Sequence, residues 1–389
     1  MAELLPLMPT YPPPRVTFAR GLGTQLWDTD GKRYLDFLCG LAVTSLGHAH
    51  PAVAAALAAQ ASTLLHVSNL FGNEVGPQVA STLDRLLGGG GQVFLCNSGA
   101  EANECAIKLA RRWGGRGRHT VLSAYGSFHG RTLATLTATG QPTKHEPFQP
   151  LPEGFGYVAW NDASDLERQL DPTTVAAVLL EPLQGEGGVQ PADPGYLREV
   201  RRICDERGVL LIIDEIQTGL GRTGLWWGFE HAGIQPDVVT SAKALGNGVP
   251  IGACWARADV AAAFQPGDHG STFGGQPLAC SAAVATLRVM EEEDVPVRAA
   301  KAGERLRAGL DAIPGVIATR GLGLLLAAEL DPGLVEARQG AAGVQVALLE
   351  AGLVVNAVTP TSIRFAPPLL VSDAEIDEAL GIVGRVLAP

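Results

Sequence analysis

Apolar and polar positions follow two patterns along most of this chain, one typical of strands and one of helices. From about residue 60 onward, short apolar runs lie at 92–96, 119–122, 176–180, 209–213, 237–241 and 252–256, and helical patterns separate them. Continuous apolar runs of this length are typical of strands that are buried on both faces. The alternation therefore predicts an α/β fold, with a mainly parallel sheet covered by helices on both faces.

The two ends of the chain have patterns of their own. Residues 23–37 predict a β-hairpin, with Asp30 and Gly31 as the two-residue turn between β-rich flanks. Beyond residue 277, a long helix leads to a section with its own helices and strands, including strands at 323–330 and 362–366. We expect three parts: an N-terminal segment 1–55 that contributes to a small domain, a large α/β domain at 56–277, and a small α+β domain at 278–389.

Composition and charge narrow the class of protein. A formal net charge of −11 over 389 residues, with no basic stripe, argues against a nucleic-acid partner. The six cysteines lie far apart without a CxxC pair, so we expect them to be reduced and mostly buried. The sequence has neither a secretory signal pattern nor an apolar window of about 18 residues, so we expect a cytoplasmic protein with no membrane partner.

Two opposite charges stand where neighbouring predicted strands end. Asp214 follows the strand 209–213, and Lys243 follows the strand 237–241 after one further residue. Ligands of open parallel sheets bind beyond the carboxyl ends of the strands, so we expect both side chains to reach one pocket. Pyridoxal phosphate requires such a pair, because a lysine holds its aldehyde as a Schiff base and an acid keeps its pyridine nitrogen protonated. A structural ion pair for Asp214 and a surface position for Lys243 are the alternatives.

A third feature suits the phosphate of that cofactor. The strand 92–96 runs into a turn of small residues, and a helical pattern begins directly after it. Unpaired backbone N–H groups and the positive end of the helix dipole converge at such a point. We expect Ser98, Gly99 and Ala100 to hold a phosphate there; the alternative is that these residues are small for steric reasons alone.

Two other classes of function fit parts of the sequence. GLGRTG at 219–224 matches the glycine pattern of dinucleotide-binding enzymes and raises the hypothesis of a nicotinamide-dependent oxidoreductase. Its context disfavours that hypothesis, because five residues separate the glycines from the strand and no strong helix start follows. A non-catalytic binding protein on the same fold would not need Asp214, Lys243 and the phosphate turn together. His48 and His50, the one close histidine pair, lack the further ligands of a metal site, so we expect no metal.

Five motifs in the same order resemble those of the class III aminotransferases. They are NSGAEANE at 97–104, SFHGRT at 127–132, EPLQGEGG at 181–188, DEIQTG at 214–219 and SAKALG at 241–246. The resemblance runs from about Tyr11 to the carboxyl end. It implies the type I fold of pyridoxal-phosphate-dependent transferases, with a seven-stranded, mainly parallel sheet, and a homodimer whose active sites lie at the subunit interface. Two features depart from the family pattern: the segment 11–16 is richer in proline, and Asn247 stands where glycine is common.

The resemblance also implies roles in binding pyridoxal 5'-phosphate. Lys243 would hold the cofactor as a Schiff base, and Asp214 would pair with its pyridine nitrogen. Phe128 would stack on the ring, and Gln217 would approach the phenolic oxygen. The phosphate would be held by Ser98, Gly99 and Ala100 of one subunit and by Thr272 of the other.

Within the family, the motifs are most similar to those of members that act on N-acetylornithine in arginine biosynthesis. That likeness implies a ping-pong transfer of the terminal amine to 2-oxoglutarate, giving N-acetylglutamate 5-semialdehyde and glutamate. Arg131 would bind the α-carboxylate of the amine donor, which Ser271 would also touch. Arg364 would bind the α-carboxylate of glutamate, and Glu186 would mask Arg364 during the other half-reaction. Members acting on ornithine, 4-aminobutyrate, succinylornithine or carrier-linked semialdehydes of lysine biosynthesis share most of these motifs, so the amine donor stays open.

Overall fold

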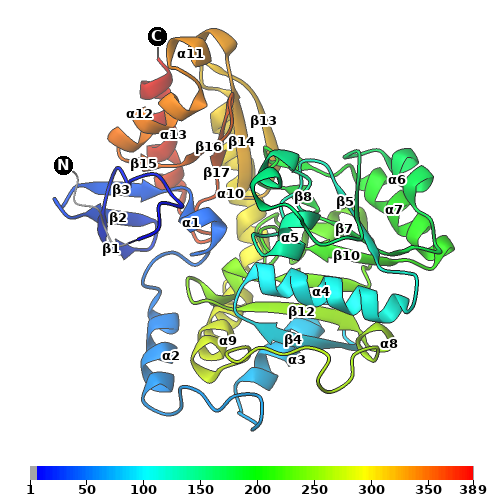
Figure 1. The fold of residues 1–389 in the computed structure, drawn as a ribbon. Helices are drawn as coiled ribbons and strands as arrows, with labels where there is room; N and C mark the ends of the chain where they lie inside the picture. The colour runs from blue at the N-terminus through cyan, green and yellow to red at the C-terminus, as the bar shows by residue number, and fades with distance from the viewer. Residues whose placement is uncertain (1–6, 389) are drawn as a thin grey trace.

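A seven-stranded sheet is the largest element of the computed structural model, which describes residues 7–388 (Figure 1). Its strands stand in the order β4 (Gly91–Cys96), β12 (Gly252–Arg257), β11 (Val238–Ser241), β10 (Leu210–Asp214), β7 (Val175–Leu180), β5 (Thr120–Ala124) and β6 (Phe155–Val158). β12 is antiparallel to both of its neighbours, and the other four pairs are parallel. The predicted α/β fold with a mainly parallel sheet is confirmed.

The structure contains the strands predicted from the sequence, and their ends differ from the predicted ends by at most two residues. Asp214 is the last residue of β10 rather than the first one after it, because it stays in register with Thr240 of β11. The sequence pattern misses β6 altogether. This short strand, FGYV, lies at the edge of the sheet and is only partly buried, so it lacks the continuous apolar run of the central strands.

Alternate residues of the central strands face two separate cores. In β10, Leu210 and Ile212 pack in the core on the side of α4 (Gly99–Gly114), while Leu211 and Ile213 belong to the larger core on the other side. The first face also carries α8 (Ala258–Ala261), and α5 (Leu133–Ala138) packs beside α4. The other core includes residues of α3 (Gly76–Leu86), α6 (Ala163–Gln169), α7 (Pro194–Arg207) and α9 (Pro277–Glu292). Helices therefore cover both faces, as the pattern predicts.

The N-terminal strands join the C-terminal part of the chain. β1 (Phe18–Leu22), β2 (Gln25–Asp28) and β3 (Arg33–Asp36) form an antiparallel sheet, and β15 (Leu353–Val354) pairs with β3 in parallel. This pairing supports the proposal that the N-terminal segment contributes to a small domain; residues 1–6 of that segment lie outside the described residues. The β2–β3 hairpin is confirmed, but its loop has three residues, because Asp28 N donates to Lys32 O and Gly31, at φ +83°, completes the turn.

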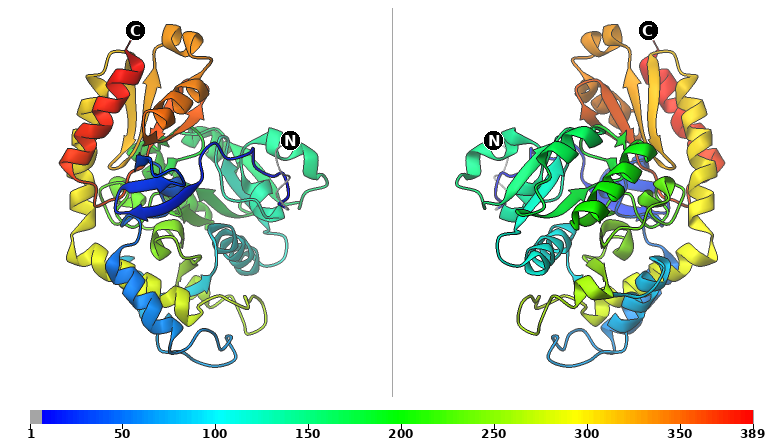
Figure 2. Two further views of the ribbon diagram at one scale, coloured as in Figure 1. Left: turned by 90° about the vertical axis from the view of Figure 1, so that its left-hand side faces the viewer. Right: turned by 90° about the vertical axis from the view of Figure 1, so that its right-hand side faces the viewer.

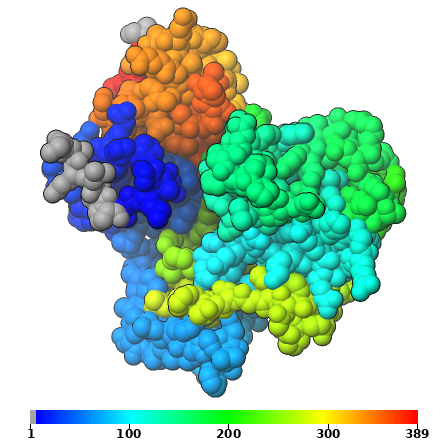
Figure 3. All heavy atoms as spheres, viewed as in Figure 1, coloured from blue at the N-terminus to red at the C-terminus, as the bar shows by residue number. Residues whose placement is uncertain are grey.

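A third sheet lies at the C-terminal end, in the order β13 (Val316–Leu322), β14 (Leu325–Leu330), β17 (Ser362–Phe365) and β16 (Asn356–Thr359). Its helices are α10 (Val295–Asp311), α11 (Pro332–Ala337), α12 (Ala341–Glu350) and α13 (Asp373–Leu387). Figure 2 shows the N-terminal strands beside this unit, and in Figure 3 both meet the atoms of the seven-stranded part. We propose residues 55 and 277 as the boundaries between these parts.

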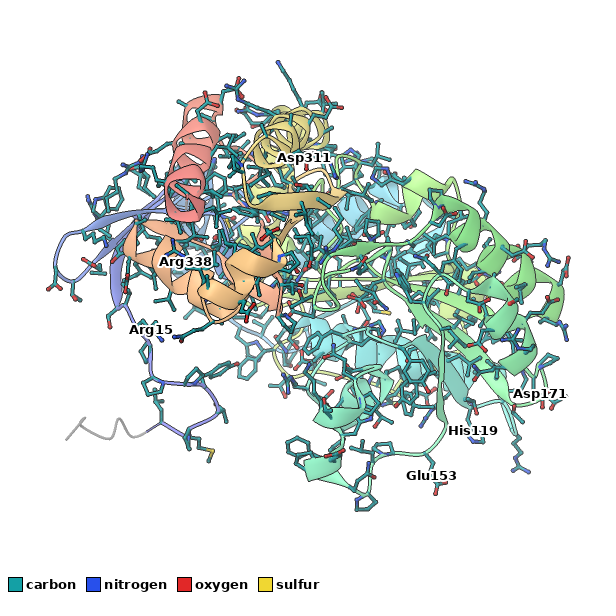
Figure 4. All side chains as sticks on the ribbon, turned by 90° about the horizontal axis from the view of Figure 1, so that it is seen from above. Arg15, His119, Glu153, Asp171, Asp311 and Arg338 are labelled. Atoms are coloured by element: carbon teal, nitrogen blue, oxygen red, sulfur yellow. The ribbon has the colours of Figure 1, made fainter. Side chains whose placement is uncertain are left out.

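The amino ends of the parallel strands point away from the C-terminal unit. His119, Glu153 and Asp171, which precede β5, β6 and β7, lie on one side in Figure 4, while Asp311 and Arg338 mark the C-terminal unit on the other. The carboxyl ends of the strands therefore face the C-terminal unit. The two-stranded sheet β8 (Leu183–Gln184) and β9 (Gln190–Pro191) follows β7 at that edge.

One segment between the N-terminal strands and α2 (Pro51–Ala61) has an unusual backbone. The four residues of α1 (Cys39–Ala42) have φ values of +54°, +60°, +70° and +62°, so they form a left-handed turn, which we call the 39–42 turn. Only one of the four is glycine. All six cysteines are free and buried, as expected. Within residues 7–388, no helix is long and apolar enough to span a membrane.

Candidate active site

The carboxyl ends of the central strands open into one cavity of about 450 Å³. Nine of the predicted site residues line it: Ser98, Gly99, Ala100, Phe128, Arg131, Glu186, Asp214, Gln217 and Lys243. The predicted common pocket for Asp214 and Lys243 therefore exists. Ser271, Thr272 and Arg364 do not line this cavity.

Asp214 is held by donors from three parts of the chain. Its Oδ2 atom accepts from Asn103 Nδ2 at 2.7 Å and from His129 Nδ1 at 2.9 Å, and its Oδ1 atom accepts from Ile216 N at 3.0 Å. The side chain is 4% exposed. These donors stabilise the negative charge of the carboxylate and fix its orientation at the cavity wall. The arrangement suits a carboxylate that pairs with a cationic ring nitrogen.

Lys243 follows β11 by one residue and begins the 3₁₀ turn Lys243–Gly246. Burial lowers the pKa of its amine from 10.5 to about 8, although nearby carboxylates, Glu186 first among them, oppose that change. Its φ of +39° places the residue in the left-handed region, which is uncommon for a side chain larger than glycine. A buried amine with a lowered pKa is a better nucleophile and base near neutral pH than a surface lysine.

The start of α4 presents unpaired backbone donors to the same cavity. Ser98 caps the helix, and its Oγ atom accepts from Glu101 N at 3.2 Å, which leaves its O–H free to donate. The N–H groups of Gly99 and Ala100 lie in the first turn, where no intrahelical acceptor exists. A Cβ atom at position 99 would lie 2.8 Å from Ile216 Cδ1, so close packing also requires glycine here. Both the anion-binding reason and the steric reason for small residues therefore apply.

An ion pair between a buried arginine and a partly exposed glutamate lies at the edge of the cavity. Arg364, in β17, is 1% exposed and donates from Nη1 to Glu186 Oε1 at 2.6 Å and to Gln217 Oε1 at 3.3 Å. Burial alone would raise the pKa of Glu186, but the Arg364 guanidinium, together with Lys243 and a hydrogen bond with Gln217, outweighs burial and lowers it. The Nη2 atom of Arg364 is buried without a hydrogen-bond partner. One face of this guanidinium thus remains available to a further acceptor.

The other predicted substrate and phosphate residues lie further out. Arg131 is exposed, and its guanidinium lies 5.6 Å from the centre of the Phe128 ring. Ser271 Oγ accepts from Asn97 Nδ2 at 3.0 Å and faces a second cavity of about 540 Å³. Thr272 is exposed beside it. Ser271 and Thr272 therefore have no contact with the first cavity within one chain.

Sequence reasoning missed three residues that the structure brings to the site. Asn103 of α4 links Asp214 to Thr240 Oγ1 and to His129 O. His129 lies in the motif at 127–132, in which roles were predicted only for Phe128 and Arg131. Glu181, directly after β7, is 7% exposed, lines the cavity and accepts from Phe128 N at 3.1 Å. Burial and the nearby charge of Asp214 raise the pKa of Glu181 well above its ordinary value.

The sequence carries a signal for Glu181 but none for Asn103. Glu181 ends a buried strand, as Asp214 does, and that position alone could have marked it as a candidate. Asn103 carries no such mark, because a polar residue in a helix is usually solvated. Only the packing of α4 on β10 and β11 turns it inward.

The residues around the first cavity fit pyridoxal phosphate. The buried carboxylate suits the ring nitrogen, the buried amine suits the aldehyde, and the free N–H groups of α4 suit the phosphate. Together with the mainly parallel sheet, this fit defines a pyridoxal-phosphate-dependent transferase of fold type I.

Comparisons with known proteins identify the family. The chain belongs to the class-III aminotransferases, whose family model matches residues 8–387. It is 49% identical to the acetylornithine aminotransferase of Gloeobacter violaceus, over 98% of this chain and 96% of that one. The ornithine aminotransferase of Toxoplasma gondii, whose structure has partial occupancy of PLP at the active site, superposes with a TM-score of 0.91 at 37% identity, covering 98% of this chain and 92% of that one. The N-acetylornithine aminotransferase of Stenotrophomonas maltophilia gives 0.83 at 36%, covering 97% and 96%.

Proposed function

We propose that this aminotransferase moves the terminal amine of N-acetylornithine to 2-oxoglutarate, giving N-acetylglutamate 5-semialdehyde and glutamate in arginine biosynthesis. The observation that carries the proposal is the presence of two arginines of different exposure near one cavity: Arg131 lines it, and Arg364 is buried and donates to the lining residues Glu186 and Gln217. A guanidinium can bind a carboxylate through two parallel hydrogen bonds, so each arginine suits one substrate. The high identity to acetylornithine aminotransferases supports the same donor.

The protein contributes positioning and proton transfer to this reaction. Bound pyridoxal phosphate supplies an electron sink, which stabilises the charge left on carbon when a proton is removed. Lys243 Nζ removes that proton and returns it at the neighbouring position, as a general base and then a general acid. Asp214 would pair with the ring nitrogen, Phe128 would stack on the ring, and Gln217 would approach the phenolic oxygen. Ser98, Gly99 and Ala100 would hold the phosphate.

Glu186 decides which arginine is available. In the described structure its carboxylate covers Arg364 at 2.6 Å, so an amine donor meets Arg131 and not Arg364. The α-carboxylate of 2-oxoglutarate would displace Glu186 and take both nitrogens of the Arg364 fork, one of which has no partner at present. One cavity can then serve two substrates that differ in the position of their carboxylates.

The donor is tested by single-turnover rates of the purified enzyme with N-acetylornithine, ornithine, succinylornithine and 4-aminobutyrate, followed by the visible absorbance of the cofactor. We expect N-acetylornithine to react fastest. A faster reaction with 4-aminobutyrate, whose carboxylate lies one carbon closer to the terminal amine and whose chain has no α-amine, would refute the role of Arg131. A faster reaction with ornithine or succinylornithine would replace the donor and keep the mechanism.

The division between the arginines is tested by Arg364→Lys, which keeps the charge and loses the planar fork. We expect the half-reaction with glutamate to slow by roughly tenfold to a hundredfold, because a buried bidentate contact is lost, while the half-reaction with N-acetylornithine changes little. Arg131→Lys is the matched variant and should give the opposite preference. Equal losses in both half-reactions for either variant would contradict the division.

We further propose a homodimer in which Thr272 reaches the phosphate of the partner's cofactor. Large exposed apolar side chains gather in the segments that flank the second cavity: Leu64, Leu65, Leu70, Phe71 and Phe273. Apolar groups concentrated in this way are typical of a buried subunit interface. Thr272 lies in the same region, is exposed, and does not line its own chain's cavity.

A mixed dimer tests this assignment. In each mixed dimer of one Lys243→Ala chain and one Thr272→Ala chain, a shared site would restore one complete set of residues and about half of the activity of a wild-type dimer. If Thr272 served its own chain, no complete set would form and the mixture would stay as inactive as its parents. Sedimentation of the unmodified protein as a monomer would also exclude the proposal.

A further inference from the structure

Arg222 belongs to the glycine-rich segment 219–224, which has no part in the chemistry proposed above. The segment does not open a helix, since the next helical turn is the 3₁₀ turn Gly228–Ala232. Its glycines serve close packing instead, because a Cβ atom at Gly221 would lie 2.8 Å from Val295 Cγ1 of α10. Arg222 itself is 1% exposed and is among the largest fully buried side chains.

The guanidinium of Arg222 connects segments that are far apart in the sequence. Nη1 donates to Leu324 O at 3.0 Å and to Pro367 O at 2.6 Å, and Nη2 donates to Ser45 Oγ at 3.1 Å. No carboxylate contributes to its pKa, which burial lowers to about 10. A buried cation without a carboxylate partner is costly. The planar fork is therefore retained for its geometry, since it reaches three acceptors at once.

One of these connections holds the 39–42 turn. Non-glycine residues in the left-handed region cost roughly 1–2 kcal/mol each and persist only where the surroundings impose that backbone. Ser45, just after the turn, accepts from Arg222 and has its own carbonyl bonded by Leu369 N at 2.7 Å. Leu46 N donates to Asn247 Oδ1 at 2.8 Å, which ties the same stretch to the loop after Lys243. Val43, between the turn and Ser45, lines the active-site cavity.

The other connection holds the end of β17. Pro367, the acceptor of the shortest bond from Arg222, stands three residues after Arg364. Ala366 N donates to Phe37 O at 2.7 Å, so the same stretch is also bonded to the residues before the turn. The stretches that contain Val43 and Arg364 are thus both hydrogen-bonded to the Arg222 side chain, which belongs to the seven-stranded part.

We propose that Arg222 is a positioning residue, which holds Val43 and Arg364 at the distance from Lys243 that substrate binding requires. The part concerning Arg364 rests on the proposed recognition of glutamate and 2-oxoglutarate by that arginine. The cofactor residues Asp214, Lys243 and Ser98 lie on the seven-stranded sheet and its connections, and Arg222 donates no hydrogen bond to them. Arg222 thereby sets substrate affinity separately from cofactor affinity.

The test is Arg222→Lys in the holoenzyme, with Arg307→Lys as the matched control. Arg307 also donates to two backbone carbonyls, Thr319 O at 2.7 Å and Gly321 O at 2.6 Å, but neither acceptor belongs to the stretches that contain Val43 and Arg364. We expect Arg222→Lys to raise the KM for the keto-acid substrate by roughly tenfold, since small misplacements of binding groups have effects of this order. We expect kcat and the dissociation constant of pyridoxal phosphate to stay within about twofold. Arg307→Lys should lower Tm without a change in KM.

If Arg222 had only a structural role, both variants would have a lower Tm and each would keep the unmodified enzyme's KM for the keto-acid substrate. That result would overturn the proposal. KM is measured with whichever amine donor the enzyme uses best, so a wrong donor would not obscure the outcome. If Arg222→Lys fails to fold, Ser45→Ala decides the question, because it removes only the bond to the 39–42 turn. We expect it to raise the KM for the amine donor at unchanged kcat; an unchanged KM in folded Ser45→Ala would also refute the proposal.

Discussion

Replacement of Lys243 by methionine is expected to stabilise the cofactor-free protein at neutral pH, although it removes the amine on which the reaction depends. Burial lowers the pKa of Lys243 from 10.5 to about 8. A difference of about 2.5 in pKa corresponds to about 3 kcal/mol, at about 1.4 kcal/mol for each factor of ten. This free energy opposes folding whenever the lysine is protonated in both the folded and the unfolded state. Methionine keeps an unbranched apolar stem and carries no charge, so it removes that opposition.

The effect has a defined dependence on pH. The folded-state pKa lies below the unfolded one, so the unfolded chain binds more protons between about pH 8 and pH 10.5. The stability of the unmodified protein therefore rises with pH through this window. The destabilisation by Lys243 is complete below about pH 8 and disappears above about pH 10.5. The gain in free energy of unfolding from Lys243→Met should therefore be full below about pH 8 and disappear above about pH 10.5.

Thermal unfolding of the two cofactor-free proteins measures this difference. An entropy of unfolding of about 2 cal/mol/K per residue gives about 0.8 kcal/mol/K for this chain, so about 3 kcal/mol raises Tm by roughly 4 °C. Lys301→Met, at an exposed position of α10, is the control and should leave Tm unchanged. A Tm of Lys243→Met equal to or below that of the unmodified protein near pH 7 would refute the reasoning. So would a gap of the same size near pH 10.

Other buried groups lead to three more expected outcomes. Burial raises the pKa of Glu215 from 4.5 to about 7, so the folded state binds more protons in that interval and stability falls as pH rises through it; Glu215→Gln should lose this dependence in urea unfolding at about pH 5 and pH 8. Burial also raises the pKa of Glu181 above its ordinary value, so stability should fall as pH rises, and Glu181→Gln should lessen that loss in urea unfolding compared at about pH 5 and pH 8. Asn103→Ala removes one of the two side-chain donors to Asp214 Oδ2 and the acceptor of the Thr240 hydroxyl, which we expect to cost about 1–3 kcal/mol of stability in urea unfolding and to weaken cofactor binding in absorbance titrations.

The strands that the sequence predicts well are those buried on both faces. Central strands such as β7 and β10 read as unbroken apolar runs, because neither face meets water. The edge strand β6 has no such run and was missed. The 39–42 turn was missed for a different reason: its residues have no left-handed preference of their own, apart from Gly40. Bonds from distant segments impose that backbone.

The site residues likewise differ in whether a local sequence signal marks them. Asp214 and Lys243 were predictable because a charge directly at the end of a buried strand has few structural explanations, and Ser98 because a helix start leaves donors unpaired. Arg364 and Glu186 were predicted from family resemblance, and only the structure shows their 2.6 Å ion pair. Asn103 was not predicted, because its bond to Asp214 joins positions 111 residues apart.

The sequence by itself determined the α/β architecture, the pairing of a carboxylate with an amine at adjacent strand ends, and the membership of an aminotransferase family. The first two follow from local periodicity and from residue types at strand ends, and the third follows from the resemblance of five short motifs to those of the family; each of these signals lies within a short stretch of the chain. The tertiary structure alone decided the pKa of Lys243, the cover of Glu186 over Arg364, and the bonds of Arg222 to Ser45 and Pro367. Burial and hydrogen-bond geometry arise only when distant segments pack together, so no local pattern could have specified them.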